Sequence, residues 1–240
     1  MATLSVKTIA ANCLDRTPTF SLRRHIFGVY GNNNRNRSLK AQLNLIRTRP
    51  HIRVAIVTVR PVGSTQGQYA NLQRDLDLTN DVWQDDAAAW VYCTGVATVY
   101  TNILGSNGVL NQNSCPLGVQ GSPTQEEDDL FDLGRNLGAD LVGYYITGST
   151  NPGLIGCSAY PAGRRGFWVA MNSNQNTFGH ELTHVVGLNP HSNQDPLVPD
   201  DDDDQDNLMW PTPGAITNPP PDLRQANRDR ILGDPGMESC

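Results

Sequence analysis

Five segments of the chain have the apolar, β-branched composition of strands. In residues 51–60 the side chains of Ile52, Val54 and Ile56 recur at every second position, and Thr58 continues that face. A period of two is typical of a β-strand. The other four expected strands are segments 95–102, 139–148, 153–161 and 166–172.

Other segments show the period or the boundary residues of helices. Residues 68–84 place Leu72, Leu76, Thr79 and Trp83 on one helical face. A second helix is expected over about 123–137, with Ser122-Pro123 and Gln125 at its start and Gly138 as its stop. Segment 221–233 reads as a third helix, ended by Gly233. Strand and helix signals that alternate along the chain predict an α/β fold.

The 240 residues are enough for one well-buried domain, and charge divides them unevenly. Residues 1–60 hold eleven Lys or Arg and the single acid Asp15, giving +10, whereas 61–240 hold seven against twenty-three, giving −16. We expect a basic leader at 1–50, read as a pro-segment or clamp on the acidic domain 51–240, or as a merely solvated segment. The leader lacks the interleaved aromatics of a nucleic-acid surface, so no nucleic-acid partner is expected. No stretch approaches the roughly 18 apolar residues of a membrane span, and no signal peptide is visible.

The five cysteines show no C-x-x-C pair. Two disulfides and one remaining thiol would suit an oxidising compartment, and buried thiols are the alternative. The most natural pair in the sequence is Cys93 with Cys115, because a hairpin-like excursion separates them.

Segment 178–191, FGHELTHVVGLNPH, holds three of the five histidines. His180 and His184 are four residues apart, so a helix would present both imidazoles on one face to one ion, with Glu181 beside them. Gly187 suits a sharp turn out of the helix, and His191 can then return as a third ligand. Three protein ligands and an open position are typical of catalytic zinc, and a neighbouring carboxylate can accept a proton from the activated water. An ordinary histidine pair is the alternative, but the continuation into Gly187 and His191 weakens it.

HELTHVVGLNPH (180–191) resembles the H-E-x-x-H-x-x-G-x-x-H motif of the metzincin zinc endopeptidases, and DNLMWP (206–211) resembles their Met-turn. Segment 153–181 is similar to the reprolysin (adamalysin) branch in its order of edge strand, strand and active-site helix, while Met-Trp-Pro is closer to the matrixins. The resemblance spans roughly 50–235 in element order, although only the helix and the Met-turn are specific. It implies an α/β fold of the α+β zincin type: a twisted, mixed five-stranded sheet with an antiparallel edge strand, an active-site helix, a Met-turn and a C-terminal helix.

The resemblance also implies a function. The chain would be a secreted zinc metalloendopeptidase that cleaves proteins or peptides by metal-activated water. His180, His184 and His191 would bind zinc, Glu181 would act as the general base and Met209 would lie beneath the metal. The edge strand, with Gly156, Cys157, Ser158 and Ala159, would pair with an extended substrate.

The chain departs from the metzincin motif at Pro190, where the family has its third histidine. His191 is one residue late, so either the Asn189-Pro190 step bulges or Asp195 supplies the third bond; we prefer His191, because proline favours an extended preceding residue. Pro211 stands where some members carry a tyrosine ligand, so that feature is absent.

Several alternatives stay open. The acidic run 199–207 suits calcium, although such a run is more often solvated. Cys13 suits either a latency switch of a zymogen or, preferably, a disulfide. A non-catalytic module with structural zinc, or a zinc hydrolase of a non-peptide substrate, would also fit the histidines. The oligomeric state is not indicated by the sequence.

Overall fold

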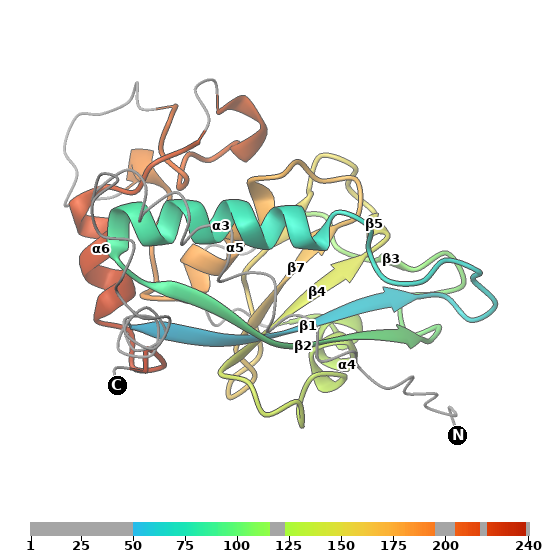
Figure 1. Ribbon diagram of the computed structural model, residues 1–240. Helices are drawn as coiled ribbons and strands as arrows, with labels where there is room; N and C mark the ends of the chain where they lie inside the picture. Colours follow the sequence, from blue (N-terminus) through green and yellow to red (C-terminus); the bar gives the residue numbers. More distant parts are fainter. Residues whose placement is uncertain (1–49, 116–122, 195–204, 217–219, 239–240) are drawn as a thin grey trace, which may run out of the picture.

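The computed structural model describes residues 50–115, 123–194, 205–216 and 220–238. Its main sheet has five strands in the order β2-β1-β4-β7-β6 (Figure 1). The strands β1 (His51–Arg60), β2 (Trp90–Tyr100), β4 (Leu141–Ile146) and β7 (Gly166–Ala170) are parallel, and β6 (Gly156–Cys157) pairs antiparallel with β7 at the edge. A small second sheet pairs β3 (Val109–Leu110) with β5 (Gly148–Ser149). The expected α/β class and mixed five-stranded sheet with an antiparallel edge are confirmed.

The strand boundaries differ from the expected ones where tertiary contacts decide them. The expected strand 51–60 is β1, which is buried over most of its length. β2 begins five residues before the expected segment 95–102, because the buried residues Trp90 and Val91 pair with His51 and Ile52. Of segment 153–161, only Gly156 and Cys157 form a strand.

Helices cover both faces of the sheet (Figure 1). Helix α3 (Leu72–Ala87) and helix α5 (Thr177–Val185) pack over one face, and α4 (Gln125–Asp132) packs over the other. The neighbouring residues Tyr144 and Tyr145 show why, since successive side chains of a strand point to opposite faces. The Tyr145 ring stacks with Phe178 of α5, whereas the Tyr144 ring contacts Phe131 of α4 edge to face.

The boundaries of α4 and of the C-terminal helix follow their capping residues. α4 is shorter than the expected 123–137 and begins after Thr124, whose hydroxyl accepts from the Glu127 amide while the Glu127 carboxylate accepts from the Thr124 amide. Helix α6 (Gln225–Leu232) is followed by Gly233, as expected. It packs against α3, where Arg228 bonds Asp86.

The expected pairing of Cys93 with Cys115 is wrong. Cys115 is bonded to Cys157, with Cα atoms 5.5 Å apart, and Cys93 is buried within β2. The spacing of the cysteines suggested a local hairpin, but the fold brings Cys115 to the edge strand β6, 42 residues later.

Several expectations lie outside the described residues: the structure of the leader at 1–49, Cys13, Asp195 and most of the acidic run 199–207. Among the residues that are described, no helix has both the length and the apolar character to cross a membrane.

Candidate metal centre

Helix α5 carries His180, Glu181 and His184, and the core determines which way it faces. Its apolar side chains Phe178, Leu182 and Val185 are fully buried. Phe178 packs edge to face on Phe167 of β7, and the Thr183 hydroxyl accepts a hydrogen bond from the Trp83 indole of α3. The apolar side of the helix is therefore held against the sheet and α3, and this fixes the direction of both histidines.

The two helical histidines are each held by a backbone carbonyl. Nδ1 of His180 donates to the Leu208 carbonyl at 2.7 Å, and Nδ1 of His184 donates to the Asn189 carbonyl at 2.6 Å. A carbonyl can only accept, so the proton of each neutral ring is on Nδ1. Each Nε2 atom therefore presents a lone pair, the form that binds a metal.

The segment after α5 returns the chain to these histidines through a left-handed turn. Gly187 and Leu188 have φ values of 76° and 53°. A Cβ atom on residue 187 would lie 2.3 Å from the carbonyl oxygen of Arg230, so only glycine fits beside α6. The positive φ values thus fall just before the Asn189-Pro190 step at which the bulge was expected.

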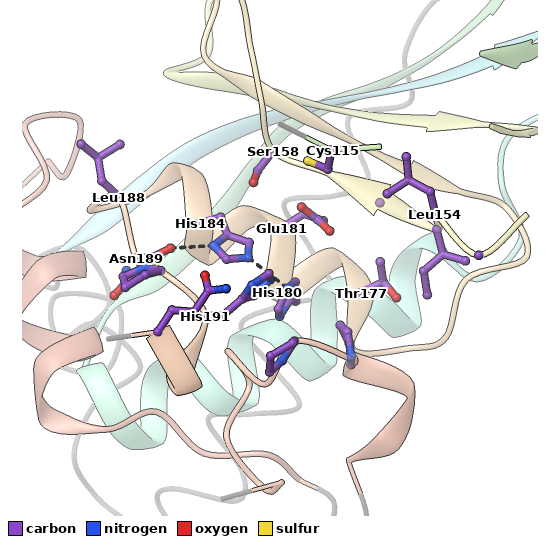
Figure 2. A pocket seen from close by; sticks show the side chains of 17 residues that line it. Cys115, Leu154, Ser158, Thr177, His180, Glu181, His184, Leu188, Asn189 and His191 are labelled. Carbon is purple, nitrogen blue, oxygen red and sulfur yellow. Dashed lines mark hydrogen bonds between the residues drawn. The ribbon is translucent and has the colours of Figure 1, made fainter. Parts of the chain in front are cut away.

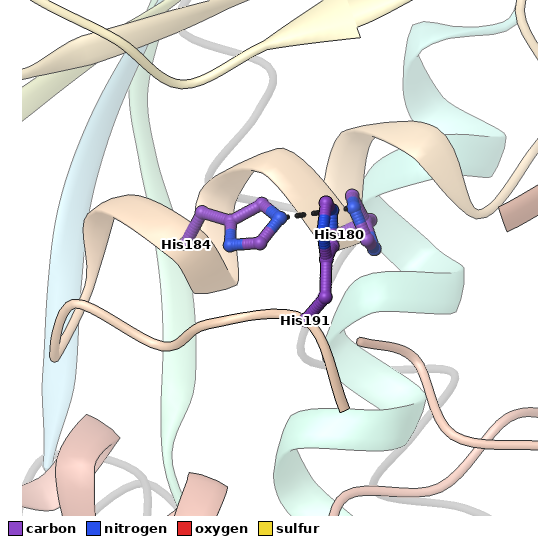
Figure 3. Close-up of side chains that lie close together, drawn as sticks. All are labelled: His180, His184 and His191. Carbon is purple, nitrogen blue, oxygen red and sulfur yellow. Dashed lines mark hydrogen bonds between the residues drawn. The ribbon is translucent and has the colours of Figure 1, made fainter. Parts of the chain in front are cut away.

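The three imidazoles converge (Figure 3). One ring nitrogen from each of His180, His184 and His191 lies within 4.8 Å of the others, so the group can hold a metal ion. The Nε2 atoms of His180 and His184 are 3.0 Å apart. Metal–nitrogen bonds of about 2.0–2.1 Å in a tetrahedral site place two nitrogens roughly 3.3 Å apart, so this spacing leaves room for one metal ion bound by both rings.

The facing lone pairs provide a test of whether a metal fits. Because both Nδ1 atoms carry the protons, the two Nε2 atoms meet as acceptors with no hydrogen between them. Burial, and then the charge of His184, hold the pKa of His180 well below its usual value, and burial lowers the pKa of His184 to about 4. Burial also lowers the pKa of His191. Protonation is thus disfavoured, and a cation between the rings would satisfy the lone pairs.

Glu181 lies beside the histidines at the edge of the sheet (Figure 2). Burial raises its pKa to about 8, opposed by a hydrogen bond from Ser158. A Cβ atom at Gly156 would lie 2.6 Å from the Glu181 carboxylate, so the absent side chain makes room for it. A divalent cation nearby would lower this pKa and favour the carboxylate.

A pocket of about 370 Å³ opens over these groups (Figure 2). Of the expected substrate strand, Gly156 and Ser158 line the pocket, whereas Cys157 and Ala159 are buried outside its lining. Cys115 lines the pocket and joins Cys157 to its rim. The remaining lining includes the apolar residues Leu154, Ile155, Leu188 and Pro213.

The turn at Asn207–Trp210 supports the centre from below. The Trp210 amide donates to the Asn207 carbonyl, and Met209 is fully buried. The Leu208 carbonyl holds His180, and the Met209 carbonyl accepts from the amide of Ser192, next to His191. The expected Met-turn segment is therefore a turn that binds both the helix and the returning segment.

The chain has no match among models of known protein families, and no curated protein is similar enough in sequence to count as a relative.

Proposed function

We propose that the chain is a secreted zinc-dependent endopeptidase of the metzincin type. The main support is the position of Glu181, which lies between three convergent histidines and the short antiparallel edge strand β6. The mixed sheet, the turn around Met209 and the C-terminal helix α6 fit the same interpretation. The disulfide between Cys115 and Cys157 fits an oxidising, extracellular setting.

Different residues would have different roles in hydrolysis. His180, His184 and His191 would hold the zinc ion, which when bound supplies Lewis acidity to a water molecule and to the scissile carbonyl. The Glu181 carboxylate would accept a proton from the attacking water and pass it to the leaving amine nitrogen. An extended peptide alongside Gly156 and Ser158 would place its carbonyl near Glu181.

The rival function, a binding module with structural zinc, would need a closed four-ligand site. Among the described residues, no fourth His, Cys, Asp or Glu joins the three histidines. This favours a site with an open coordination position. The two functions can be distinguished by experiment, because only the endopeptidase would cleave peptide bonds.

The test is the variant Glu181→Gln, which keeps the size of the side chain and removes its basicity. We expect the purified variant to bind about one zinc ion per chain and to lose cleavage of an unfolded protein by about 100-fold or more. Asp129→Asn, on the exposed surface of α4, is the matched control and should cleave normally. Mass spectrometry of the products would distinguish internal cleavage from removal of terminal residues.

Cleavage at the normal rate by Glu181→Gln would remove the proposed base. If the unaltered chain, with residues 1–49 cut away, binds zinc but cleaves no peptide bond, the binding module is favoured. Hydrolysis of a small ester without any peptide cleavage would favour the non-peptide hydrolase instead.

A further inference from the structure

Three buried asparagines lie next to one another behind the metal centre. Asn189 follows the exit turn of α5, Asn207 begins the turn that contains Met209, and Asn227 belongs to α6. Their exposed fractions are 3%, 0% and 1%. Buried amides are costly unless each is hydrogen-bonded, so their partners indicate what they do.

The three side chains form one chain of hydrogen bonds. Asn207 Nδ2 donates to Asn227 Oδ1 over a long 3.5 Å, and Asn227 Nδ2 donates to Asn189 Oδ1 at 3.1 Å. Asn189 Nδ2 then donates to the carbonyls of Thr183 and Val186 at 3.1 and 2.9 Å, at the end of α5.

Backbone groups fix the direction of every amide in this chain. The Met209 amide donates to Asn207 Oδ1 at 2.7 Å, and the Arg224 amide donates to Asn227 Oδ1 at 3.2 Å. At the far end, two carbonyls accept from Asn189 Nδ2. Because backbone amides only donate and carbonyls only accept, turning any one amide over would lose bonds on both sides.

The two ends of this series of hydrogen-bonded asparagines, Asn189 and Asn207, lie in the two segments that hold the helical histidines. The Asn189 carbonyl accepts from His184 Nδ1, and the carbonyl of Leu208, the residue after Asn207, accepts from His180 Nδ1. Asn227 connects Asn189 with Asn207, and it lies on helix α6, outside the two segments that hold the histidines. We infer that Asn227 is a positioning residue for the metal: through Asn189 and Asn207 it fixes the two carbonyls that set the tautomer and direction of His184 and His180.

This inference rests on the metal site of the proposed function and not on peptide cleavage. Groups that hold the second nitrogen of a metal-bound imidazole usually change metal affinity by about 10–100-fold when they are altered. Asn227 acts one bond further out, through main-chain segments, so the effect belongs at the lower end of that range.

The experiment compares Asn227→Ala and Asn227→Ser with the unaltered chain. Alanine removes every side-chain hydrogen bond of residue 227, whereas serine keeps an oxygen near the Arg224 amide but is too short to reach Asn189. Two quantities are measured under conditions in which each variant is folded: the zinc dissociation constant, by competition with a chromogenic chelator, and the visible absorption spectrum after loading with Co²⁺. We expect both variants to bind zinc about tenfold more weakly and to show a changed Co²⁺ spectrum.

Ile231→Ala is the matched control, because Ile231 is fully buried on the same helix and takes no part in the asparagine chain. It should lower the unfolding temperature but leave zinc affinity and the Co²⁺ spectrum unchanged. Zinc affinity and spectra equal to those of the unaltered chain in both Asn227 variants would overturn the inference, as would an equal loss of affinity in Ile231→Ala. If the unaltered chain binds no zinc, this inference and the proposed function both fail. If it binds zinc but cleaves nothing, only the proposed function fails, and the affinities still decide the role of Asn227.

Discussion

Gly187 shows how far the candidate metal centre depends on one backbone conformation. Its φ of 76° is in the left-handed region, and the Arg230 carbonyl leaves no room for a Cβ atom. This residue lets the chain leave α5 beneath α6 and bring His191 back to the other histidines. The sequence predicted the turn, because glycine stood where the helix had to end.

We expect Gly187→Ala to destabilise the fold by more than the roughly 1–2 kcal/mol that a left-handed conformation costs an L-residue. The excess comes from the clash with Arg230, and chemical denaturation would measure it. Gly163→Ala is the matched control, since Gly163 also has a φ of 76° but nothing lies within 4 Å of an added Cβ. Equal losses in the two variants would show that the contact with α6 contributes nothing.

Asp140 links β1 and β4 through a carboxylate whose pKa depends on the fold. Burial alone would raise this pKa, but hydrogen bonds from the Arg53 side chain and amide, together with the Arg53 charge, lower it below its ordinary value of 3.8. The folded chain therefore holds this proton less tightly than the unfolded chain does. The resulting stabilisation is present above about pH 3.8 and is lost as the pH falls through the lower folded value.

The Asp140→Asn variant should thus lose stability at neutral pH and show a smaller fall in stability on acidification than the unaltered chain. Urea unfolding at a series of pH values would measure the difference. The comparison between the two chains is needed because Asp75 has the opposite effect on the pH dependence of stability. Burial raises the pKa of Asp75, so its contribution to the free energy of unfolding declines as the pH rises above its ordinary pKa of 3.8. Parallel curves for the two chains would contradict the role given to Asp140.

At the scale of elements, the sequence predicted those helices and strands whose positions are determined by local sequence pattern. The strand at 51–60, the helix that carries His180 and His184, and the stop at Gly233 each followed from period or from a terminating residue. The start of β2 and the short length of β6 depend on pairing with strands that are distant in sequence. The asparagine chain has the same cause: Asn189 and Asn227 are 38 residues apart, and no local pattern distinguishes them from surface asparagines.

The disulfide between Cys115 and Cys157 is another long-range element, and it joins the rim of the pocket to the edge strand. It closes a loop with a sequence separation of 42, for which the loss of chain entropy in the unfolded state predicts a stabilisation of about 3–4 kcal/mol. We expect the double variant Cys115→Ser, Cys157→Ser to unfold at correspondingly lower denaturant concentration. A reductant should destabilise the unaltered chain more than the double variant; an equal effect on both would mean that this bond does not carry the stabilisation.

At the scale of the whole molecule, the candidate metal centre lies beside the hydrophobic core and not within it. The buried aromatic residues Phe167, Phe178 and Tyr145 join α5 to the sheet without using any of the three histidines. His191, by contrast, follows a turn that is held by hydrogen bonds at its two ends. A metal would therefore add its binding energy mainly to the segment 187–194, while the sheet would remain folded without it.

Removal of the metal by a chelator should lower the unfolding temperature without abolishing the cooperative transition. A ligand at 100 times its dissociation constant stabilises a fold by about 2.7 kcal/mol, so the loss should be of at least this order when zinc is in large excess. Hydrogen exchange should locate the change: amides in 187–194 should exchange faster after chelation, whereas those of β1 and β4, which are buried in the centre of the sheet, should not. If the core is stable without the metal, its amides should stay protected after chelation. Faster exchange throughout the sheet would therefore mean that the metal stabilises the whole fold.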